Sequence, residues 1–117
     1  MVRGTRRYRL TGTGAFERVF RSGRRSEGEY VQLVSAAAAS ACGRVGFVIG
    51  RKALPLAVDR NRVRRMLRVA LQRARPAIDR FDLIVRLKRG APRADFPRIL
   101  SEATALLAAV VLETSPR

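Results

Sequence analysis

Apolar residues recur at helical spacing in the stretch that follows Pro55. The repeat is i, i+3, i+4, i+7, i+8 and i+11, which is typical of one buried stripe on an amphipathic helix. Its members are Val63, Met66, Leu67, Ala70, Leu71 and Ala74. Asp59 suits the N-cap position, and Pro76 ends the run. The pattern predicts a helix between these two residues.

Two more helices are predicted, one near each end of the chain. Thr11 or Thr13 can cap the first, which Gly23 ends. Its apolar stripe is Phe16, Val19 and Phe20. The last helix starts near Pro92 and Pro97 and carries a long apolar stripe that is typical of core packing. That stripe consists of Phe96, Ile99, Leu100, Ala103, Leu106, Leu107 and Val110.

Three segments between the helices have the alternation or the β-branched content of strands. They are Glu29 to Ser35, Arg44 to Gly50 and Phe81 to Lys88, and the small-residue run from Ala36 to Ala41 connects the first two. In the first strand, alternation places Tyr30, Gln32 and Val34 on one face. The order of elements predicts an α+β or a split α/β sandwich with helices over a small sheet. Of the two, we expect the α+β fold, a single-domain sandwich of a small mixed sheet with helices.

Positive charge dominates the composition. The 117 residues carry a formal net charge of +16, and 25 Lys plus Arg stand against 9 Asp plus Glu. Such a field indicates a polyanionic partner, most often nucleic acid. We expect residues 1–117 to form one RNA-binding domain, with residues 1–9 as a flexible basic arm that orders on RNA and residues 113–117 as a disordered tail.

Several function classes are disfavoured. There is no histidine and only one cysteine, Cys42, so the usual general base is absent and neither an internal disulfide nor a cysteine-rich zinc site can form. No apolar run approaches a signal peptide or a membrane span, which predicts a cytoplasmic protein without a membrane partner. The acidic residues are scattered, and only Asp79 and Asp82 lie close together in sequence. A self-sufficient metal-dependent nuclease is therefore disfavoured.

The central helix gathers its polar residues opposite the apolar stripe. These residues are Asn61, Arg64, Arg65 and Arg68, and Arg62 flanks them. Arginines in a first turn oppose the helix dipole, whereas a phosphate there is favoured by both the arginines and the free backbone N–H groups. The functional interpretation is an RNA-binding face, and the alternative is a solvated basic face.

The spacing of this basic stretch resembles one known family. The matching residues are Leu54, Ala57, Arg60, Asn61, Arg62, Val63, Arg64, Arg65 and Leu67. This pattern is similar to the signature of the bacterial ribonuclease P protein subunit. Arg51 and Lys52 resemble that family's basic pair, Phe16 to Gly23 its first helix, and Asp82 to Lys88 its late strand.

The resemblance implies a fold similar to the second domain of ribosomal protein S5, with a left-handed strand–helix–strand crossover. It also implies a noncatalytic subunit of a ribonucleoprotein endonuclease that removes the 5′ leader from precursor tRNA. The partners would be the catalytic RNA subunit, which holds the Mg²⁺, and precursor tRNA. No catalytic residue and no metal site are expected on the protein, which we expect to be a monomer.

Site residues follow from the same resemblance. The catalytic RNA would bind Arg51, Lys52, Arg60, Asn61, Arg62, Arg64, Arg65 and Arg68. The leader cleft would contain Phe16, Phe20, Tyr30 and Phe47, although core packing is an open alternative for the first two. The chain departs from the family pattern at Leu33, where some relatives carry an aromatic residue, and in the glycine-free loop from Ala53 to Leu56. The second candidate function is a ribosomal or ribosome-assembly RNA-binding protein.

Overall fold

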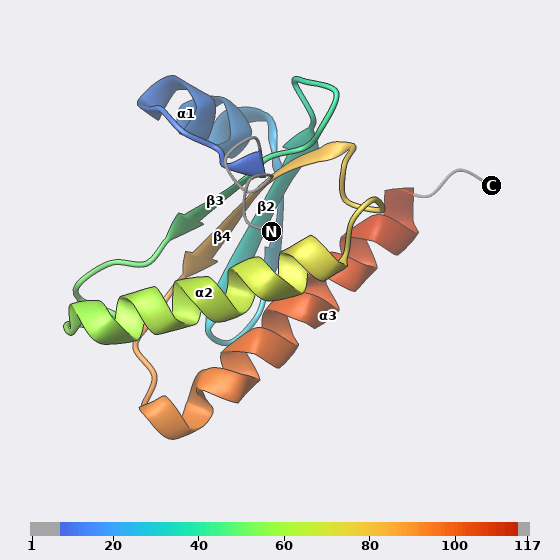
Figure 1. The fold of residues 1–117 in the computed structure, drawn as a ribbon. Helices are drawn as coiled ribbons and strands as arrows, with labels where there is room; N and C mark the ends of the chain where they lie inside the picture. Colours follow the sequence, from blue (N-terminus) through green and yellow to red (C-terminus); the bar gives the residue numbers. More distant parts are fainter. Residues whose placement is uncertain (1–7, 115–117) are drawn as a thin grey trace.

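The structure is a computed structural model that describes residues 8–114. Three long helices surround a four-stranded sheet (Figure 1). In chain order the elements are α1 (Thr13–Ser22), β1 (Arg24–Glu27), β2 (Val31–Ala37), β3 (Val45–Val48), α2 (Ala57–Arg73), β4 (Phe81–Leu87), the short 3₁₀ helix η2 (Arg93–Asp95) and α3 (Phe96–Thr114).

The sheet is mixed, with strand order β1-β2-β4-β3. The pairs β1–β2 and β2–β4 are antiparallel, whereas β3 and β4 are parallel and are joined through α2. In Figure 1 α2 crosses in front of the sheet as the chain passes from β3 to β4, which makes this crossover left-handed. The predicted α+β fold is confirmed.

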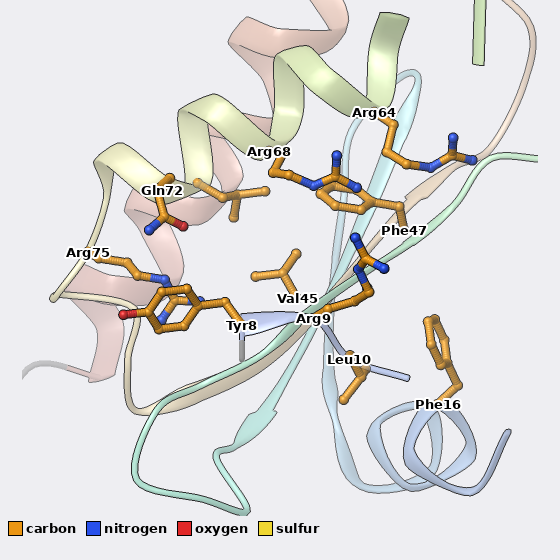
Figure 2. A pocket seen from close by; sticks show the side chains of 12 residues that line it. Tyr8, Arg9, Leu10, Phe16, Val45, Phe47, Arg64, Arg68, Gln72 and Arg75 are labelled. Carbon is orange, nitrogen blue, oxygen red and sulfur yellow. The ribbon is translucent and has the colours of Figure 1, made fainter. Parts of the chain in front are cut away.

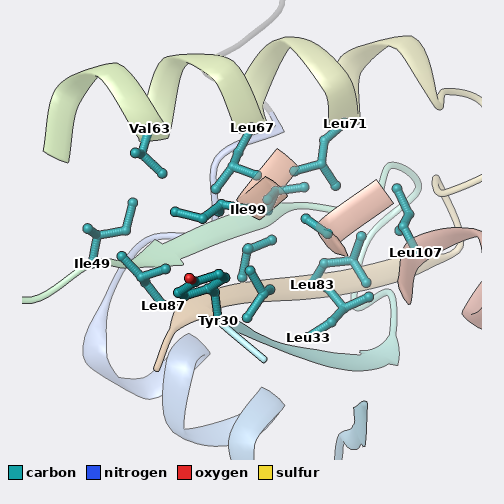
Figure 3. Packing of buried hydrophobic residues seen from close by; sticks show 14 of the residues in the cluster. Tyr30, Leu33, Ile49, Val63, Leu67, Leu71, Leu83, Leu87, Ile99 and Leu107 are labelled. Atoms are coloured by element: carbon teal, nitrogen blue, oxygen red, sulfur yellow. The ribbon is translucent and has the colours of Figure 1, made fainter. Parts of the chain in front are cut away.

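Helices cover both faces of the sheet. The large core lies between the sheet and the α2–α3 layer, where Val63, Leu67 and Leu71 of α2 meet alternate strand residues such as Leu83 (Figure 3). A smaller cluster lies on the opposite face beneath α1. Its buried members are Leu10, Val19, Val34, Ala36 and Ile84. These layers leave the free edge of β3 between α1 and α2.

Several predicted element boundaries are wrong. The N-cap of α2 is Leu56, so Asp59 lies inside the first turn, where it accepts a hydrogen bond from Arg93 Nε at 2.8 Å. The N-cap of α1 is Gly12, whose φ of 90° is in the left-handed region that favours glycine, and no side chain caps this helix. Strand β1 was not predicted, and β2 begins at Val31 rather than Glu29.

The predicted bounds of the flexible arm (residues 1–9) and of the disordered tail (residues 113–117) are also wrong within the part of the chain that the structure describes. Arg9 forms a parallel β-bridge with Val45, and the Leu10 N–H donates to the Val45 carbonyl oxygen at 2.9 Å. The end of the predicted arm therefore joins the sheet at the β3 edge. Helix α3 extends to Thr114, so residues 113–114 belong to a helix. Residues 1–7 and 115–117 lie outside the described part of the chain.

Asp82 is a buried carboxylate at the start of β4. It is 1% exposed, and it accepts hydrogen bonds from Arg18 of α1 and from the backbone N–H groups of Ala39 and Arg44. Asp79 forms an ion pair with Arg75 one helical turn away. Both carboxylates therefore have structural partners, which connect α1 and the loops to the sheet.

Candidate nucleic-acid interface

A cavity of about 390 Å³ opens between α1, α2 and the free edge of β3. We call it the arginine groove, and Figure 2 shows the side chains that surround it. It is lined by Tyr8, Arg9, Leu10, Phe16, Val45, Gly46, Phe47, Arg64, Arg68, Leu71, Gln72 and Arg75. Its volume lies within the range of small-ligand sites, roughly 300–1,000 Å³.

Four guanidinium groups and no carboxylate line the arginine groove as the structure describes it. Arg64 donates to Asn61 Oδ1 at 2.9 Å, and Arg75 is paired with Asp79. Arg9 and Arg68 have no ion pair or hydrogen-bond acceptor for their side chains within residues 8–114. Burial lowers the pKa of Arg68, and the positive charges of Arg9 and Arg64 lower it further. The groove therefore concentrates positive charge that an anion can neutralise.

Aromatic rings form the other part of the lining. The Arg68 guanidinium carbon lies 5.6 Å from the centroid of the half-buried Phe47 ring. Phe16 packs so closely on β3 that a Cβ atom at Gly46 would collide with its ring. At the far end, the Arg75 guanidinium carbon lies 3.8 Å from the Tyr8 ring centroid. The groove thus combines cations with partly exposed aromatic faces, as proteins that bind single-stranded RNA do.

The structure brings only two of the four predicted leader-cleft residues into this groove, namely Phe16 and Phe47. Phe20 is half-buried on α1 outside the groove, with the Arg25 guanidinium carbon 5.6 Å from its ring centroid. Both α1 phenylalanine rings are therefore half-buried, and of the two only Phe16 lines the groove.

The placement of Tyr30 in an open cleft is wrong. Tyr30 is 5% exposed and belongs to the large core on the α2–α3 side of the sheet. Its hydroxyl donates to Asp95 Oδ2 at 2.9 Å, and its backbone N–H donates to Glu102 Oε1 at 2.7 Å. Because Tyr30 precedes β2 and is held by these two carboxylates, it does not follow the strand alternation that Gln32 and Val34 obey.

The predicted RNA-binding residues of α2 divide among three environments. Arg64 and Arg68 line the groove, whereas Arg65 and Asn61 are exposed on the helix surface. The exposed Arg62 has its guanidinium carbon 6.0 Å from the Phe96 ring centroid, toward the start of α3.

The remaining predicted residues lie close to the start of α2. Arg60 donates to the carbonyl oxygens of Leu54 and Pro55 at 2.8 and 2.9 Å, so it fixes the loop before the helix. Arg51 and Lys52 are exposed in the turn that follows β3. The basic surface thus continues from this turn along α2 to the groove.

Among the groove residues that sequence reasoning missed, Gln72 and Arg75 come from α2 and the turn that follows it. Together with Arg64 and Arg68 they recur at i, i+4, i+8 and i+11, a polar stripe on one side of α2 that continues just past its end. This spacing was available in the sequence. The contributions of Tyr8 and Arg9 were not, because they depend on the bridge that joins Arg9 to β3.

The α+β fold, with its mixed sheet, and the groove lined by cations and aromatic rings are typical of a class of small basic nucleic-acid-binding proteins. Comparison with known families is more specific, because the family model described as Ribonuclease P matches residues 5–111. The chain belongs to the ribonuclease P protein family. Within the described residues, no helix is both long and apolar enough to cross a membrane.

Individual relatives agree with this membership. A ribonuclease P protein component from Acidothermus cellulolyticus is 36% identical over 104 residues, which cover 86% of each chain. One from Nitrosococcus oceani is 31% identical over 99 residues, covering 82% of this chain and 83% of the relative. The match to one from Nitrosomonas eutropha is shorter, 34% identity over 64 residues, and spans about half (53%) of that protein.

Solved structures share the fold. The RNase P protein of Staphylococcus aureus superposes with a TM-score of 0.76 at 21% identity, covering 88% of this chain and 94% of that one. The protein from Thermotoga maritima gives a TM-score of 0.67 at 20% identity, covering 92% and 98%. The predicted resemblance to this family, and the fold that it implied, are confirmed.

Proposed function

We propose that this chain is the protein subunit of ribonuclease P, acting with a catalytic RNA to remove the 5′ leader from precursor tRNA. The observation that carries the proposal is the arginine groove, whose unpaired cations and aromatic rings suit RNA, in a chain that belongs to this family. The protein would bind and position RNA rather than cleave it. We place it in the cytoplasm as a monomer within the ribonucleoprotein.

We assign the basic groups and the aromatic rings of this surface to different RNA partners. Exposed arginines of α2 and the turn at Arg51 and Lys52 would contact phosphates of the catalytic RNA. The half-buried rings of Phe16 and Phe20 would contact the unpaired leader, because aromatic faces stack on bases without reading sequence. The catalytic Mg²⁺ would be held by the RNA subunit. In support, Asp79 and Asp82 already serve as partners of Arg75 and Arg18.

Reconstitution tests the proposal. The purified chain is titrated into transcribed ribonuclease P RNA, and binding and precursor-tRNA cleavage are measured at low Mg²⁺ concentration. We expect the protein to bind this RNA and to stimulate 5′-leader removal, whereas the protein alone should not cleave at any Mg²⁺ concentration.

A paired set of variants provides the control. Replacing Arg64 and Arg65 with Gln should weaken binding of the RNA more than replacing Arg21 and Arg73 with Gln. The second pair of substitutions removes the same charge from exposed positions outside the groove. Cleavage by the protein alone, or copurification with ribosomal particles instead of one structured RNA, would contradict the proposal. The second outcome would favour a ribosomal or ribosome-assembly role.

A further inference from the structure

Helix α1 is attached to the sheet by a thin layer of apolar side chains. Among its ten described residues, only Val19 is fully buried. Ala15, Phe16 and Phe20 are half-buried beside it. Because apolar contact is non-directional, this packing alone does not fix the rotation of the helix about its own axis. The orientation of α1 therefore depends on its polar contacts.

One ion pair supplies the directional contact. Arg18 of α1 donates to the carboxylate of Asp82, at the start of β4. Its other terminal nitrogen donates to the Ala37 carbonyl oxygen at 3.4 Å. The Arg18 side chain is 37% exposed, whereas that of Asp82 is 1% exposed. Separating a buried carboxylate from its cation is costly, so the pair holds this turn of α1 at one position on the sheet.

The same carboxylate also fixes the start of β3, which forms another wall of the arginine groove. The backbone N–H groups of Ala39 and Arg44 donate to Asp82 at 3.2 and 2.9 Å. Arg44 directly precedes β3, and its carbonyl oxygen accepts a hydrogen bond from the Leu83 N–H at 2.8 Å. Asp82 therefore aligns α1 and β3 relative to one point on β4.

The contact that depends on this alignment joins Phe16 to β3. The Phe16 ring packs directly on the strand backbone at Gly46, where a Cβ atom would overlap the ring. The ring projects from α1 into the groove (Figure 2). Arg18 lies only two residues from Phe16, so a rotation of α1 that separated Arg18 from Asp82 would also move the ring away from Gly46.

We propose that Arg18, Asp82 and Gly46 are positioning residues that set the place of the Phe16 ring against β3, and thereby the affinity for precursor tRNA. The inference rests on the proposed function, in which this ring contacts the unpaired leader. It adds three residues that act without contacting RNA. Arg18 acts through the ring and not as a phosphate contact, because Asp82 already neutralises its charge.

The position of the ring can be measured without RNA in the full-length protein. A ring packed on Gly46 shifts the NMR signals of the glycine α protons through its ring current. We expect Arg18→Gln to reduce this shift, and Arg18→Lys, which can still pair with Asp82, to retain most of it. The control Arg21→Gln removes the same charge from an exposed position on α1 and should leave the shift unchanged. Unchanged Gly46 signals in folded Arg18→Gln protein would overturn the inference.

Binding by the reconstituted enzyme gives the functional readout. Arg18→Gln should weaken precursor-tRNA binding about fivefold, as expected when one base no longer stacks on a ring. Mature-tRNA binding and the affinity for the RNA subunit should not change, and Arg21→Gln should change none of the three. A loss shared by both tRNAs, or no loss, would overturn the inference.

Gly46→Ala tests the same position from the strand side and leaves the Arg18–Asp82 pair intact. Its methyl group should displace the Phe16 ring and give the same selective loss of precursor binding. This variant decides the question even if Arg18→Gln does not fold. Wild-type selectivity in folded Gly46→Ala protein would overturn the inference.

A double-mutant cycle separates positioning from direct contact. If Arg18 acts only through the ring, Arg18→Gln should cause no further loss of precursor binding once Phe16 is replaced by Ala. Additive losses would show that Arg18 contacts RNA itself and would overturn the inference, while wild-type RNA binding still supported the proposed function. Failure of the wild-type protein to bind the RNA subunit would contradict the function itself.

Discussion

At the scale of single residues, the partners of each guanidinium group decide whether it stabilises the fold or remains available to RNA. Arg60 stabilises the fold, because it donates to two loop carbonyl oxygens. Arg75 does the same through its ion pair with Asp79 and its hydrogen bond to the Gly43 carbonyl oxygen. Arg65 is exposed on α2 with no such contact within the described residues. Charge composition cannot make this distinction, since it depends on which carbonyl groups lie within reach.

Arg65→Ala and Arg60→Ala should therefore have different consequences. Arg65→Ala should weaken binding to the RNA subunit, more than Arg6→Ala in the N-terminal segment, with an unchanged melting temperature. Arg60→Ala should lower the free energy of unfolding by about 1 kcal/mol, because two carbonyl oxygens lose their charged donor. Filter binding and thermal unfolding measure the two effects. Unfolding of the Arg65→Ala variant would make that residue structural and contradict its assignment to the RNA face.

Glu27 offers a pH-dependent test of the polar contacts on β1. Hydrogen bonds from Gln32 and Lys88 lower the pKa of its carboxyl group below the ordinary value of 4.5. Since the folded pKa is the lower one, this contribution to stability is present above pH 4.5 and is lost as the pH falls through the folded pKa. An NMR titration should find the Glu27 pKa below 4.5, and Gln32→Leu should raise it. An unchanged pKa in that variant would show that Gln32 is not the main cause.

At the scale of elements, most helices and strands were predictable because their apolar periodicity is strong. The strand at residues 81–87 and the stripe of α2 are in this group. Strand β1 was not predictable from periodicity, because Arg24–Glu27 contains no apolar residue and forms through pairing with β2. The N-cap of α2 was predicted wrongly because Asp59 pairs with Arg93 of the distant helix η2, a tertiary contact that local sequence does not encode.

Helix α1 allows packing to be separated from binding on one element. Val19 is fully buried, whereas Phe20 is half-buried beside Arg25. Val19→Ala should lower the free energy of unfolding by about 2 kcal/mol with little change in precursor selectivity. Phe20→Ala should weaken precursor-tRNA binding by about 1 kcal/mol and leave mature-tRNA binding unchanged. Denaturant unfolding and paired binding curves distinguish them, and equal losses for both tRNAs would place Phe20 in the core instead of the leader cleft.

At the scale of the whole molecule, the fold distributes positive charge around a compact domain and brings distant segments together at one groove. Tyr8 and Arg9, β3 and α2 are far apart in sequence but line the same cavity. The net positive charge is known from the sequence, and helix α2, which carries many of the arginines, was predicted from its apolar periodicity. The sequence could not predict the groove, because the groove depends on the crossover and on the bridge between Arg9 and Val45.

The net charge of +16 predicts a strong dependence of RNA affinity on salt. Each duplex phosphate neutralised by an arginine releases counterions, so the slope of log affinity against log salt should be about −0.9 per contact. Arg65→Ala should reduce the magnitude of that slope by about one contact. Binding measured across a range of KCl concentrations gives both values, and a weak association that is insensitive to salt would contradict a phosphate-dominated interface.

Asp82 is the most buried acidic residue in the part of the chain whose burial the structure describes. Asp82 receives Arg18 and two backbone N–H groups in a site that is 1% exposed, so Asp82→Asn should lower the free energy of unfolding by about 3 kcal/mol. Asp59→Asn should cost less, because its partner Arg93 is 59% exposed.

If the chemistry belongs to the RNA subunit, both variants should support the wild-type rate of single-turnover cleavage. The rate must be measured with saturating protein, below the melting temperature of each variant, so that only the chemical step is compared. A reduced rate for Asp82→Asn under these conditions, in a protein shown to be folded and fully bound, would give this carboxylate a role in cleavage and contradict the proposed division of labour.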